Sequence, residues 1–315
     1  MQGSGKPIVV VGSINMDLVA TAEHIPLAGE TIHASGFHTY PGGKGANQAV
    51  AAARLGYPVK MVGMLGADSF GADLRKALVA SGVDVGEVGV TDGPSGVAMI
   101  VVAASGENSI AVNAGANARL TPEYLDAKAG LLRGAGAVLT QLEIPLETVV
   151  RLSEICREAG VPLILDPAPA APLPQEILEG TRWFTPNETE AAFFAGLKGE
   201  MQDNKRVADA LFARGIGGVI LKQGAKGAYL GTPDGWSSQV DAFQVKAVDT
   251  TAAGDAFNGA FAVGLMLGRE PAESARFAAA AAAISVTRAG AQASMPDRGE
   301  VEKLLQQHAD VVSRG

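Results

Sequence analysis

The chain has 315 residues, of which 47% are hydrophobic and 18% charged, and this composition argues against a disordered protein. Its formal net charge of −8 argues against non-specific nucleic-acid binding, which needs a basic surface. The single cysteine, Cys156, excludes an internal disulfide and is typical of a reducing compartment, so we expect a cytoplasmic protein. The apolar segments at 256–268 and 277–286 are too short to span a membrane, so no membrane partner is expected.

Short apolar runs alternate with helical patterns along most of the chain. The patterns predict strands at 8–11, 59–65, 137–142, 162–165, 183–185 and 218–221, and helices at 45–55, 70–80, 146–159, 255–267 and 272–287. Strands that alternate with helices form a mostly parallel sheet covered by helices on both faces. We therefore expect an α/β fold, organised as a single domain over residues 1–315.

Two insertions, at about 17–40 and 96–113, do not fit this alternation. They contain predicted strands at 17–22, 31–39, 96–103 and 108–112, and the segment Thr31–Ser35 alternates as a one-sided strand does. We expect these strands to form a small β-sheet lid. An uncovered face of such a sheet would lie over a ligand or pair with a second subunit.

Residues 249–260, DTTAAGDAFNGA, place small residues and a Gly-Asp pair before a helical pattern. The first amides of a helix lack intrahelical acceptors and carry the positive end of the helix dipole, so this segment predicts a phosphate site. Asp255 at this site would accept a proton from an attacking hydroxyl, which indicates phosphoryl transfer to an alcohol. An aspartate at a helix start is also a favoured cap, and these residues alone leave that structural role open.

A glycine-rich segment, Pro41–Gln48, also precedes a helix and would let a polar ligand contact bare main chain, although a flexible turn is the alternative. Its spacing matches neither a Walker A loop nor a dinucleotide fingerprint. Asn15 and Asp17 share one face of extended chain and can bind two neighbouring hydroxyls of a sugar. Glu143 follows a strand at the edge where open α/β sheets bind ligands. For these three residues the alternative is a solvated strand end.

Two further segments have both a structural and a functional interpretation. Asn187 and Glu190 have the spacing of a capping box, or they order Mg²⁺-bound water near phosphate. The loop Lys222–Gly227 follows a strand and either covers nucleotide phosphates or forms a hairpin.

Five of these motifs, in this order, resemble the PfkB (ribokinase) family of carbohydrate kinases. They are GSINMD at 12–17, GGKGANQA at 42–49, TPNETE at 185–190, DTTAAGDAFNG at 249–259 and TRAGAQ at 287–292. The resemblance covers about residues 8–310. It implies a ribokinase-like fold and phosphorylation of D-ribose at its 5-hydroxyl by ATP, with Mg²⁺ bound to ATP and K⁺ as an activator.

The same resemblance implies individual roles. Asp255 would be the base, and Ala252, Ala253 and Gly254 would form the anion hole. The sugar would be bound by Asn15, Asp17, Gly43, Lys44, Gly45, Ala46, Asn47 and Glu143. The nucleotide would be bound by Asn187, Glu190, Lys222, Gln223, Gly224, Ala225, Lys226, Gly227, Gly254, Asp255 and Ala279. The monovalent cation would be bound, mostly through main-chain carbonyls, by Asp249, Thr251, Ser285, Arg288 and Gly290, and through its side chain by Ser294.

One position departs from the family pattern, and several alternatives stay open. Ala279 lies where relatives place a histidine or asparagine beside adenine, so that contact is expected to be lost. A kinase for deoxyribose, fructose or a nucleoside is the nearest alternative. A catalytically silent sugar-binding regulator would be expected to lose Asp255, and a nicotinamide oxidoreductase would need a glycine fingerprint that Gly12–Asn15 lacks. We also expect a homodimer formed through the lid.

Overall fold

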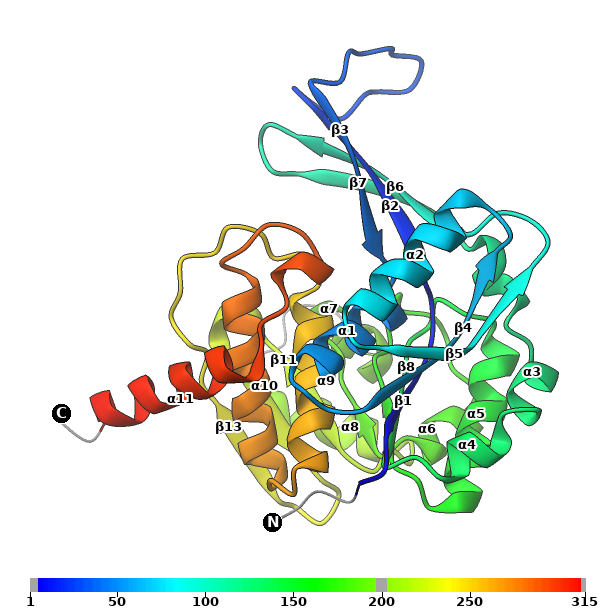
Figure 1. Ribbon diagram of the computed structural model, residues 1–315. Coiled ribbons are helices and arrows are strands. Elements are labelled where there is room, and N and C mark those ends of the chain that lie inside the picture. Colours follow the sequence, from blue (N-terminus) through cyan, green and yellow to red (C-terminus); the bar gives the residue numbers. More distant parts are fainter. Residues whose placement is uncertain (1–4, 197–202, 313–315) are drawn as a thin grey trace.

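The computed structural model describes residues 5–196 and 203–312 and has a large central sheet with helices on both sides (Figure 1). The sheet has nine strands in the order β13-β12-β11-β10-β9-β8-β1-β4-β5. In chain order these strands are β1 (Ile8–Val11), β4 (Val59–Gly66), β5 (Asp84–Thr91), β8 (Ala137–Thr140), β9 (Leu163–Leu165), β10 (Trp183–Phe184), β11 (Val219–Lys222), β12 (Ala228–Gly231) and β13 (Ser237–Val240).

The sheet is parallel from β5 to β11, and an antiparallel hairpin, β12–β13, extends it at the other edge. At the centre, Ile8 on β1 pairs with Val59 on β4 and with Ala137 on β8. All four residues of β1 are buried, as a strand covered on both faces requires. The predicted mostly parallel α/β fold is thus confirmed.

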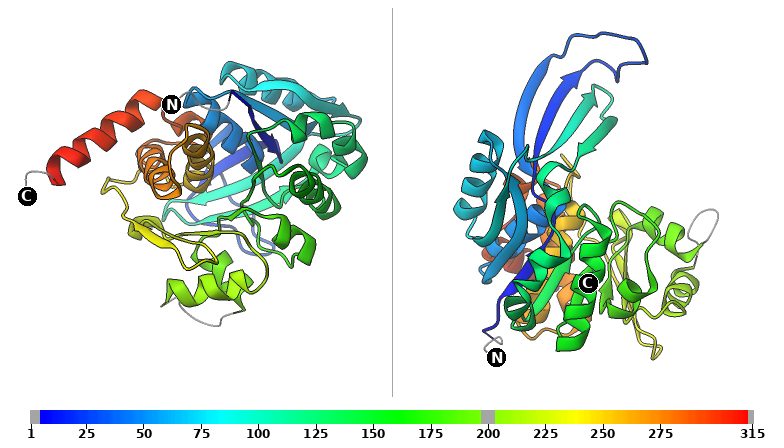
Figure 2. Two further views of the ribbon diagram at one scale, coloured as in Figure 1. Left: turned by 90° about the horizontal axis from the view of Figure 1, so that it is seen from below. Right: turned by 90° about the vertical axis from the view of Figure 1, so that its right-hand side faces the viewer.

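Two helical layers cover the sheet, and each encloses its own apolar core. One layer holds α1 (Lys44–Arg54), α2 (Ser69–Ala80), α9 (Ala253–Met266), α10 (Pro271–Ser285) and α11 (Arg298–Val312). The other holds α3 (Pro122–Asp126), α4 (Ala129–Arg133), α5 (Leu146–Ala159), α6 (Gln175–Gly180), α7 (Glu188–Ala195) and α8 (Asn204–Phe212). The two layers are seen on opposite sides of the sheet in Figure 2.

Helix α9 matters most for the site, and its packing is close. A Cβ on Gly259 would lie 2.7 Å from the carbonyl oxygen of Gln48, so the two helices α1 and α9 approach backbone to backbone there. On the sheet side, the ring of Phe261 meets Trp183 of β10 edge to face at 5.4 Å. These contacts hold the first turn of α9 beside the first turn of α1.

The lid is a four-stranded sheet in the order β3-β2-β6-β7, and it extends away from the body (Figure 1). Its strands are β2 (Asn15–Ala22), β3 (Gly36–Gly42), β6 (Gly96–Ala103) and β7 (Asn108–Asn113). Because β2 pairs with β6 residue by residue, Asp17, Ala98 and Val112 share a face. Asn15 and Asp17, which the sequence predicts to bind a ligand, thus begin a face that continues outward as an apolar surface.

Several expected details differ from the structure. The predicted strand at Thr31–Ser35 is wrong: these residues have no regular structure, and the strand begins at Gly36. Strand β5 and the hairpin β12–β13 were not predicted. The edge strands β5 and β13 are largely exposed and carry little of the apolar pattern that identifies buried strands, and β12, although mostly buried, has only four residues. Within the described residues, no helix has the length and apolarity that a membrane crossing requires.

Candidate active site

The carboxyl ends of the central strands bring the polar residues of the site together. Strand β1 leads into Asn15, β8 into Glu143, β9 into Asp166 and β11 into Lys222. This is the edge where open α/β sheets bind ligands. The topology therefore gathers side chains that are up to about two hundred residues apart in the chain.

A tight glycine turn brings the first turn of α1 to this edge. Gly43 has φ of 88°, and a Cβ there would lie 2.7 Å from the amide nitrogen of Asn15, so both its conformation and its packing need glycine. The amide of Lys44 then donates to Glu143 Oε2 at 3.3 Å, and Ser13 Oγ donates to the same oxygen at 2.5 Å. Gly45, Ala46 and Asn47 follow in the first turn and are buried.

Asn15 and Asp17 lie on one face of β2, as their spacing predicts. Asn15 Oδ1 accepts a 2.7 Å hydrogen bond from Asn117 Nδ2, and this bond orients its amide. Burial, with the negative charges of Glu143 and Asp255 nearby, raises the pKa of Asp17 to about 7. This pocket concentrates carboxylates, which accept hydrogen bonds from sugar hydroxyls.

Lys44 supplies positive charge among these carboxylates. Burial alone would lower its pKa, but the negative charges of Asp255, Asp166, Glu143 and Glu190 outweigh burial and raise the pKa above its ordinary value. The ammonium group therefore stays charged at neutral pH. It is influenced both by Glu143, which follows β8, and by Glu190 at the start of α7.

Asp255 lies in the first turn of α9 and is 5% exposed. Its Oδ2 accepts a 3.0 Å hydrogen bond from Asn47 Nδ2, and its Oδ1 accepts one of 3.1 Å from Gln48 Nε2. Burial raises its pKa to about 6, against the opposing charge of Lys44 and the two amide hydrogen bonds. Such a carboxylate is ionised at neutral pH, yet it accepts a proton more readily than an exposed aspartate.

The start of α9 has the donors that an anion needs. The amides of Gly254 and Asp255 have no acceptor within the described residues, whereas the Ala253 amide donates to Thr250 O at 3.3 Å. Ala252, which precedes the helix, has φ of 59°, in the left-handed region that residues with a Cβ seldom adopt. The helix therefore begins abruptly after Ala252, and its first amides point away from the body of the helix, as at any helix start.

A cavity of about 320 Å³ adjoins this helix start. Lys222, Gly224, Ala225, Gly227, Gly254 and Ala279 of the predicted nucleotide set line it, together with Phe243, Val245, Ala282, Ala283 and Val286. The wall from α10 thus consists of alkyl groups. A flat aromatic base fits such a wall through shape and dispersion, while the polar end of the cavity meets Gly254.

The structure is compatible with both the structural and the nucleotide-binding interpretation of residues 187–190 and 222–227. Asn187 and Glu190 form a capping box at the start of α7, in which each side chain accepts the other's backbone N–H. Burial raises the pKa of Glu190. Residues 222–227 form the turn of the antiparallel pair β11–β12, and part of this turn lines the cavity. Gln223 and Lys226 do not line the cavity: Gln223 exchanges hydrogen bonds with Asn204, and Lys226 pairs with Glu188.

The residues predicted to bind a monovalent cation lie in two loops joined by Asp249. Its carboxylate accepts the amides of Thr251, at 2.9 Å, and Gly290, at 2.8 Å. The hydroxyls of Ser285 and Ser294 donate to the carbonyls of Ala282 and Ala291. The Arg288 side chain pairs with Glu300, which leaves only its main chain for a cation. The first loop runs directly into the strained Ala252.

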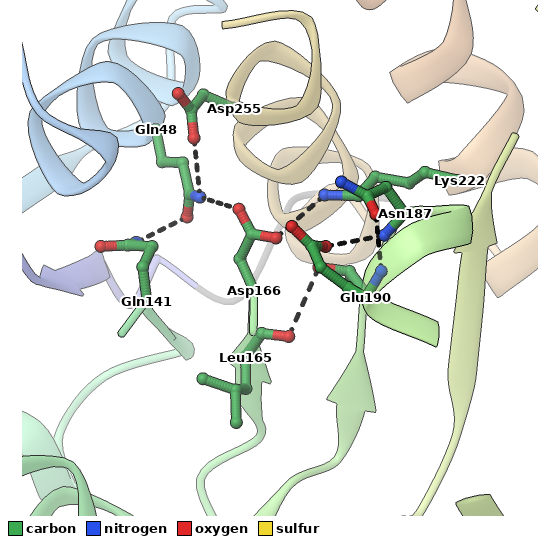
Figure 3. A network of polar contacts seen from close by, with 9 residues as sticks. Gln48, Gln141, Leu165, Asp166, Asn187, Glu190, Lys222 and Asp255 are labelled. Carbon is green, nitrogen blue, oxygen red and sulfur yellow. Dashed lines mark hydrogen bonds and ion pairs between the residues drawn. The ribbon is translucent and has the colours of Figure 1, made fainter. Parts of the chain in front are cut away.

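Sequence reasoning missed a layer of buried polar residues beneath the site (Figure 3). Gln48 donates to Asp166 and Asp255, Gln141 donates to Gln48, and Lys222 pairs with Asp166 at 2.9 Å. Gln48 was part of a recognised motif, and Asp166 directly follows a strand; these were the available signals.

Among the described residues, no group of three or more histidine, cysteine, aspartate or glutamate side chains is arranged to hold a metal ion.

A model of the pfkB family carbohydrate kinases matches residues 6–298. The chain belongs to the PfkB family of carbohydrate kinases. It is 44% identical to ribokinase of Bacillus subtilis, over 95% of this chain and 99% of the relative, and 39% identical to deoxyribokinase of Salmonella typhi, over 95% and 98%. The solved structure of Arabidopsis thaliana ribokinase complexed with ribose and ATP is 39% identical, with a TM-score of 0.89, over 95% of this chain and 98% of that one. The predicted family and fold are thus confirmed.

The raised pKa of Asp17 predicts a gain in stability when its charge is removed. Its carboxyl has a pKa of about 7 in the fold against an ordinary 3.8, so ionisation destabilises the folded protein, fully above pH 7 and progressively less as the pH falls toward 4. Asp17→Asn should therefore raise the melting temperature at pH 8 and have little effect near pH 4, as measured by calorimetry. The matched control is Asp84→Asn, which removes the partner of Lys60 and should give no gain. A lower melting temperature for Asp17→Asn at pH 8 would contradict the expectation.

Proposed function

We propose that the chain transfers the γ-phosphoryl group of ATP to the 5-hydroxyl of D-ribose. One observation carries the proposal: the buried carboxylate of Asp255 lies between two regions of different chemistry. On one side are Asn15, Asp17 and Glu143, which suit a polyhydroxyl ligand. On the other are the free amides of α9 and the apolar cavity, which suit a nucleotide. The similarity to ribokinases over nearly the whole chain supports the same substrates.

In the proposed reaction, Asp255 accepts the proton of the 5-hydroxyl while that oxygen attacks the γ-phosphorus. The new O–P bond forms as the bond to the bridging oxygen of ADP breaks, and ADP leaves with the electron pair. Phosphoryl transfer needs positioning and charge stabilisation more than covalent help. The amides of Gly254 and Asp255 would stabilise charge on the transferred group, and donors of this kind contribute about 3–4 kcal/mol each. Lys44 would offset the negative charge on both sides.

Magnesium would be bound together with ATP. In the capping box Glu190 uses Oε2, so Oε1 is outside it and can accept a hydrogen bond from Mg²⁺-bound water. Asn187 lies at the same helix start, next to the Lys222 turn. The oxygen donors fit a hard cation that keeps most of its water. Bound Mg²⁺ would neutralise charge on the phosphate oxygens.

Potassium would act through the two loops joined by Asp249. A cation bound by their carbonyls would fix residues 249–251, and these residues lead directly into the anion hole. The effect would therefore be on the orientation of the first α9 amides. Arg288 and Ser285 would contribute through main chain, and Ser294 through its hydroxyl oxygen.

The nearest alternative is a kinase with another sugar, because the chain is also similar to a deoxyribokinase. The pair Asn15 and Asp17 favours a sugar with two adjacent free hydroxyls, which 2-deoxyribose lacks. ATP consumption measured with ribose, deoxyribose, fructose and adenosine decides between them. A silent regulator would give no turnover with any of these compounds, although Asp255 and its glycine neighbours are all present.

We also place the enzyme in the cytoplasm. Burial raises the pKa of the Cys156 thiol to about 12, which keeps this cysteine unreactive, and the chain has no second cysteine with which to form an internal disulfide.

Replacing Asp255 with asparagine tests the catalytic assignment. Asparagine keeps the shape of the side chain but cannot accept the hydroxyl proton, so kcat should fall by about 10²–10⁴-fold or more. Ribose binding, measured by calorimetry, should stay largely intact. Asp255→Asn with near-normal turnover would end the assignment.

Replacing the cation in the assay tests the potassium site. Rates in K⁺ should exceed those in tetramethylammonium by about 5-fold or more, because ordering of the anion hole should depend on the bound cation. Asp249→Asn should reduce this difference by weakening the bridge between the loops. Equal wild-type rates in the two salts would rule out activation.

The uncovered lid is expected to form a homodimer. Tyr40, Ile110 and Val112 are 40%, 53% and 54% exposed on the lid face that begins at Asp17. A free-standing four-stranded sheet with apolar residues exposed in this way favours pairing with a second copy. The four-stranded lid would then both cover the sugar site and form the dimer interface.

Light scattering at micromolar concentration should give about twice the 32.0 kDa mass of the chain. Ile110→Lys should shift the protein toward the monomer, because it would bury a charge in the interface. Val79→Lys is the matched control: Val79 on α2 is 55% exposed and lies outside the lid. A wild-type protein found only at 32.0 kDa would refute the dimer.

A further inference from the structure

Gln48 is a buried amide that joins two carboxylates of the site (Figure 3). It lies on α1, is 1% exposed, and its Nε2 donates to Asp255 Oδ1 at 3.1 Å and to Asp166 Oδ2 at 3.0 Å. Both hydrogens of its NH₂ group are therefore used, one on each carboxylate. Neither contact involves the main chain of α1, so neither is needed to form the helix.

A second amide fixes the orientation of Gln48. Gln141 Nε2 donates to Gln48 Oε1 at 2.7 Å. If the Gln48 amide were flipped, its oxygen would face two carboxylate oxygens and its NH₂ group would face the NH₂ group of Gln141. Only one orientation satisfies all four groups, so the donors must face Asp166 and Asp255.

The far side of the bridge carries a charge pair. Asp166 Oδ1 accepts from Lys222 Nζ at 2.9 Å, and both side chains are nearly buried, at 4% and 13% exposed. The charge of Asp166 raises the pKa of Asp255, and the hydrogen bond from Gln48 lowers it. Lys222 also lies next to Gly254, in the wall of the nucleotide cavity.

We propose that Gln48 is a positioning residue for Asp255: it fixes the carboxylate against α1 and transmits to it the charge of the Asp166–Lys222 pair. The proposal rests on the proposed role of Asp255 as the base. An amide suits this position because it donates to the carboxylate without exchanging a proton with it. With Oδ1 held by Gln48 and Oδ2 by Asn47, the carboxylate of Asp255 is fixed at both oxygens, and each oxygen keeps a lone pair that can accept the hydroxyl proton.

The proposal predicts opposite shifts of a pH profile in two variants. The charged groups that face Asp255 are Lys44 from α1, Asp166 from the end of β9 and Asp17 from the lid, with Lys222 behind Asp166. Gln48→Met removes a donor to the ionised form, so the acidic limb of kcat should move to higher pH by about one unit. Asp166→Asn removes a neighbouring negative charge, so the limb should move to lower pH.

The same measurements separate positioning from structural loss. Gln48→Met should lower kcat about 10–100-fold while KM for sugar and for ATP changes less than about 3-fold, because neither ligand loses a direct contact. The control is Thr181→Val, which removes a buried hydrogen bond to Ile177 O just before β10, at the end of the sheet opposite the site, and should leave the pH profile in place. Gln141→Met frees the Gln48 amide to turn, so it should move the acidic limb of the pH profile to higher pH by a smaller amount than Gln48→Met does. This variant replaces Gln48→Met in the test if Gln48→Met does not fold.

The proposal would be overturned if the acidic limb of the pH profile did not move in either Gln48→Met or Gln141→Met. It would also be overturned if the limbs of Gln48→Met and Asp166→Asn moved in the same direction. All profiles are recorded with whichever sugar the wild-type enzyme phosphorylates best. The choice of ribose can therefore fail without affecting this test. Failure of Asp255→Asn to lose activity would instead remove the base itself.

Discussion

Several carboxylates and the phosphates of a nucleotide must lie close together at the start of helix α9. The rest of the site depends on how the repulsion between these negative charges is offset. Asp255 lies there with Asp17, Asp166 and Glu143 nearby, and the proposed second substrate is a triphosphate. Two like charges about 4 Å apart repel by about 4 kcal/mol at the effective dielectric of a partly buried site. The offsetting groups are Lys44, Lys222 and the free amides of α9.

This arrangement explains why the acidic protein needs no basic surface to bind an anionic nucleotide. The positive charge is local, and most of it comes from backbone dipoles and two buried lysines. Burial raises the pKa of Asp255 into the range useful to the proposed base at neutral pH, and the nearby charge of Asp166 raises it further. The charge of Lys44 opposes both effects and keeps the carboxylate ionised.

The sequence predicted those features that depend on local chemistry. Asp255, Gly43, Asn187 and the pair Asn15 and Asp17 on β2 were identified because each follows from a turn, a cap or a strand register that a few residues encode. Gln48 and Asp166 were not identified, because their importance comes from contacts with residues more than a hundred positions away. A buried carboxylate after a three-residue strand does not differ in sequence from a solvated one until its partners are known.

The parts of the fold that the sequence did not predict also depend on contacts with residues distant in the chain. The six inner strands β1, β4, β8, β9, β10 and β11 and the longer helices, among them α1, α2, α5, α9 and α10, were predicted because apolar periodicity reports burial. The short helices α4 and α6 were not predicted, nor was the hairpin β12–β13, in which β12 has only four residues and the edge strand β13 is largely exposed. Thr31–Ser35 alternated as a strand does, but pairing with β2 begins only at Gly36, so this segment has no neighbour with which to form a ladder.

Close packing of α1 against α9 links the two halves of the site. Gly259 allows the helices to touch through their backbones, and this contact places Asn47 and Gln48 within hydrogen-bond distance of Asp255. A helix pair held only by long side chains would sit about 8–10 Å apart, and short amide side chains would be less able to restrain the carboxylate. Gly259 is therefore as much a part of the proposed catalytic geometry as the polar residues, since it sets the distance over which they act.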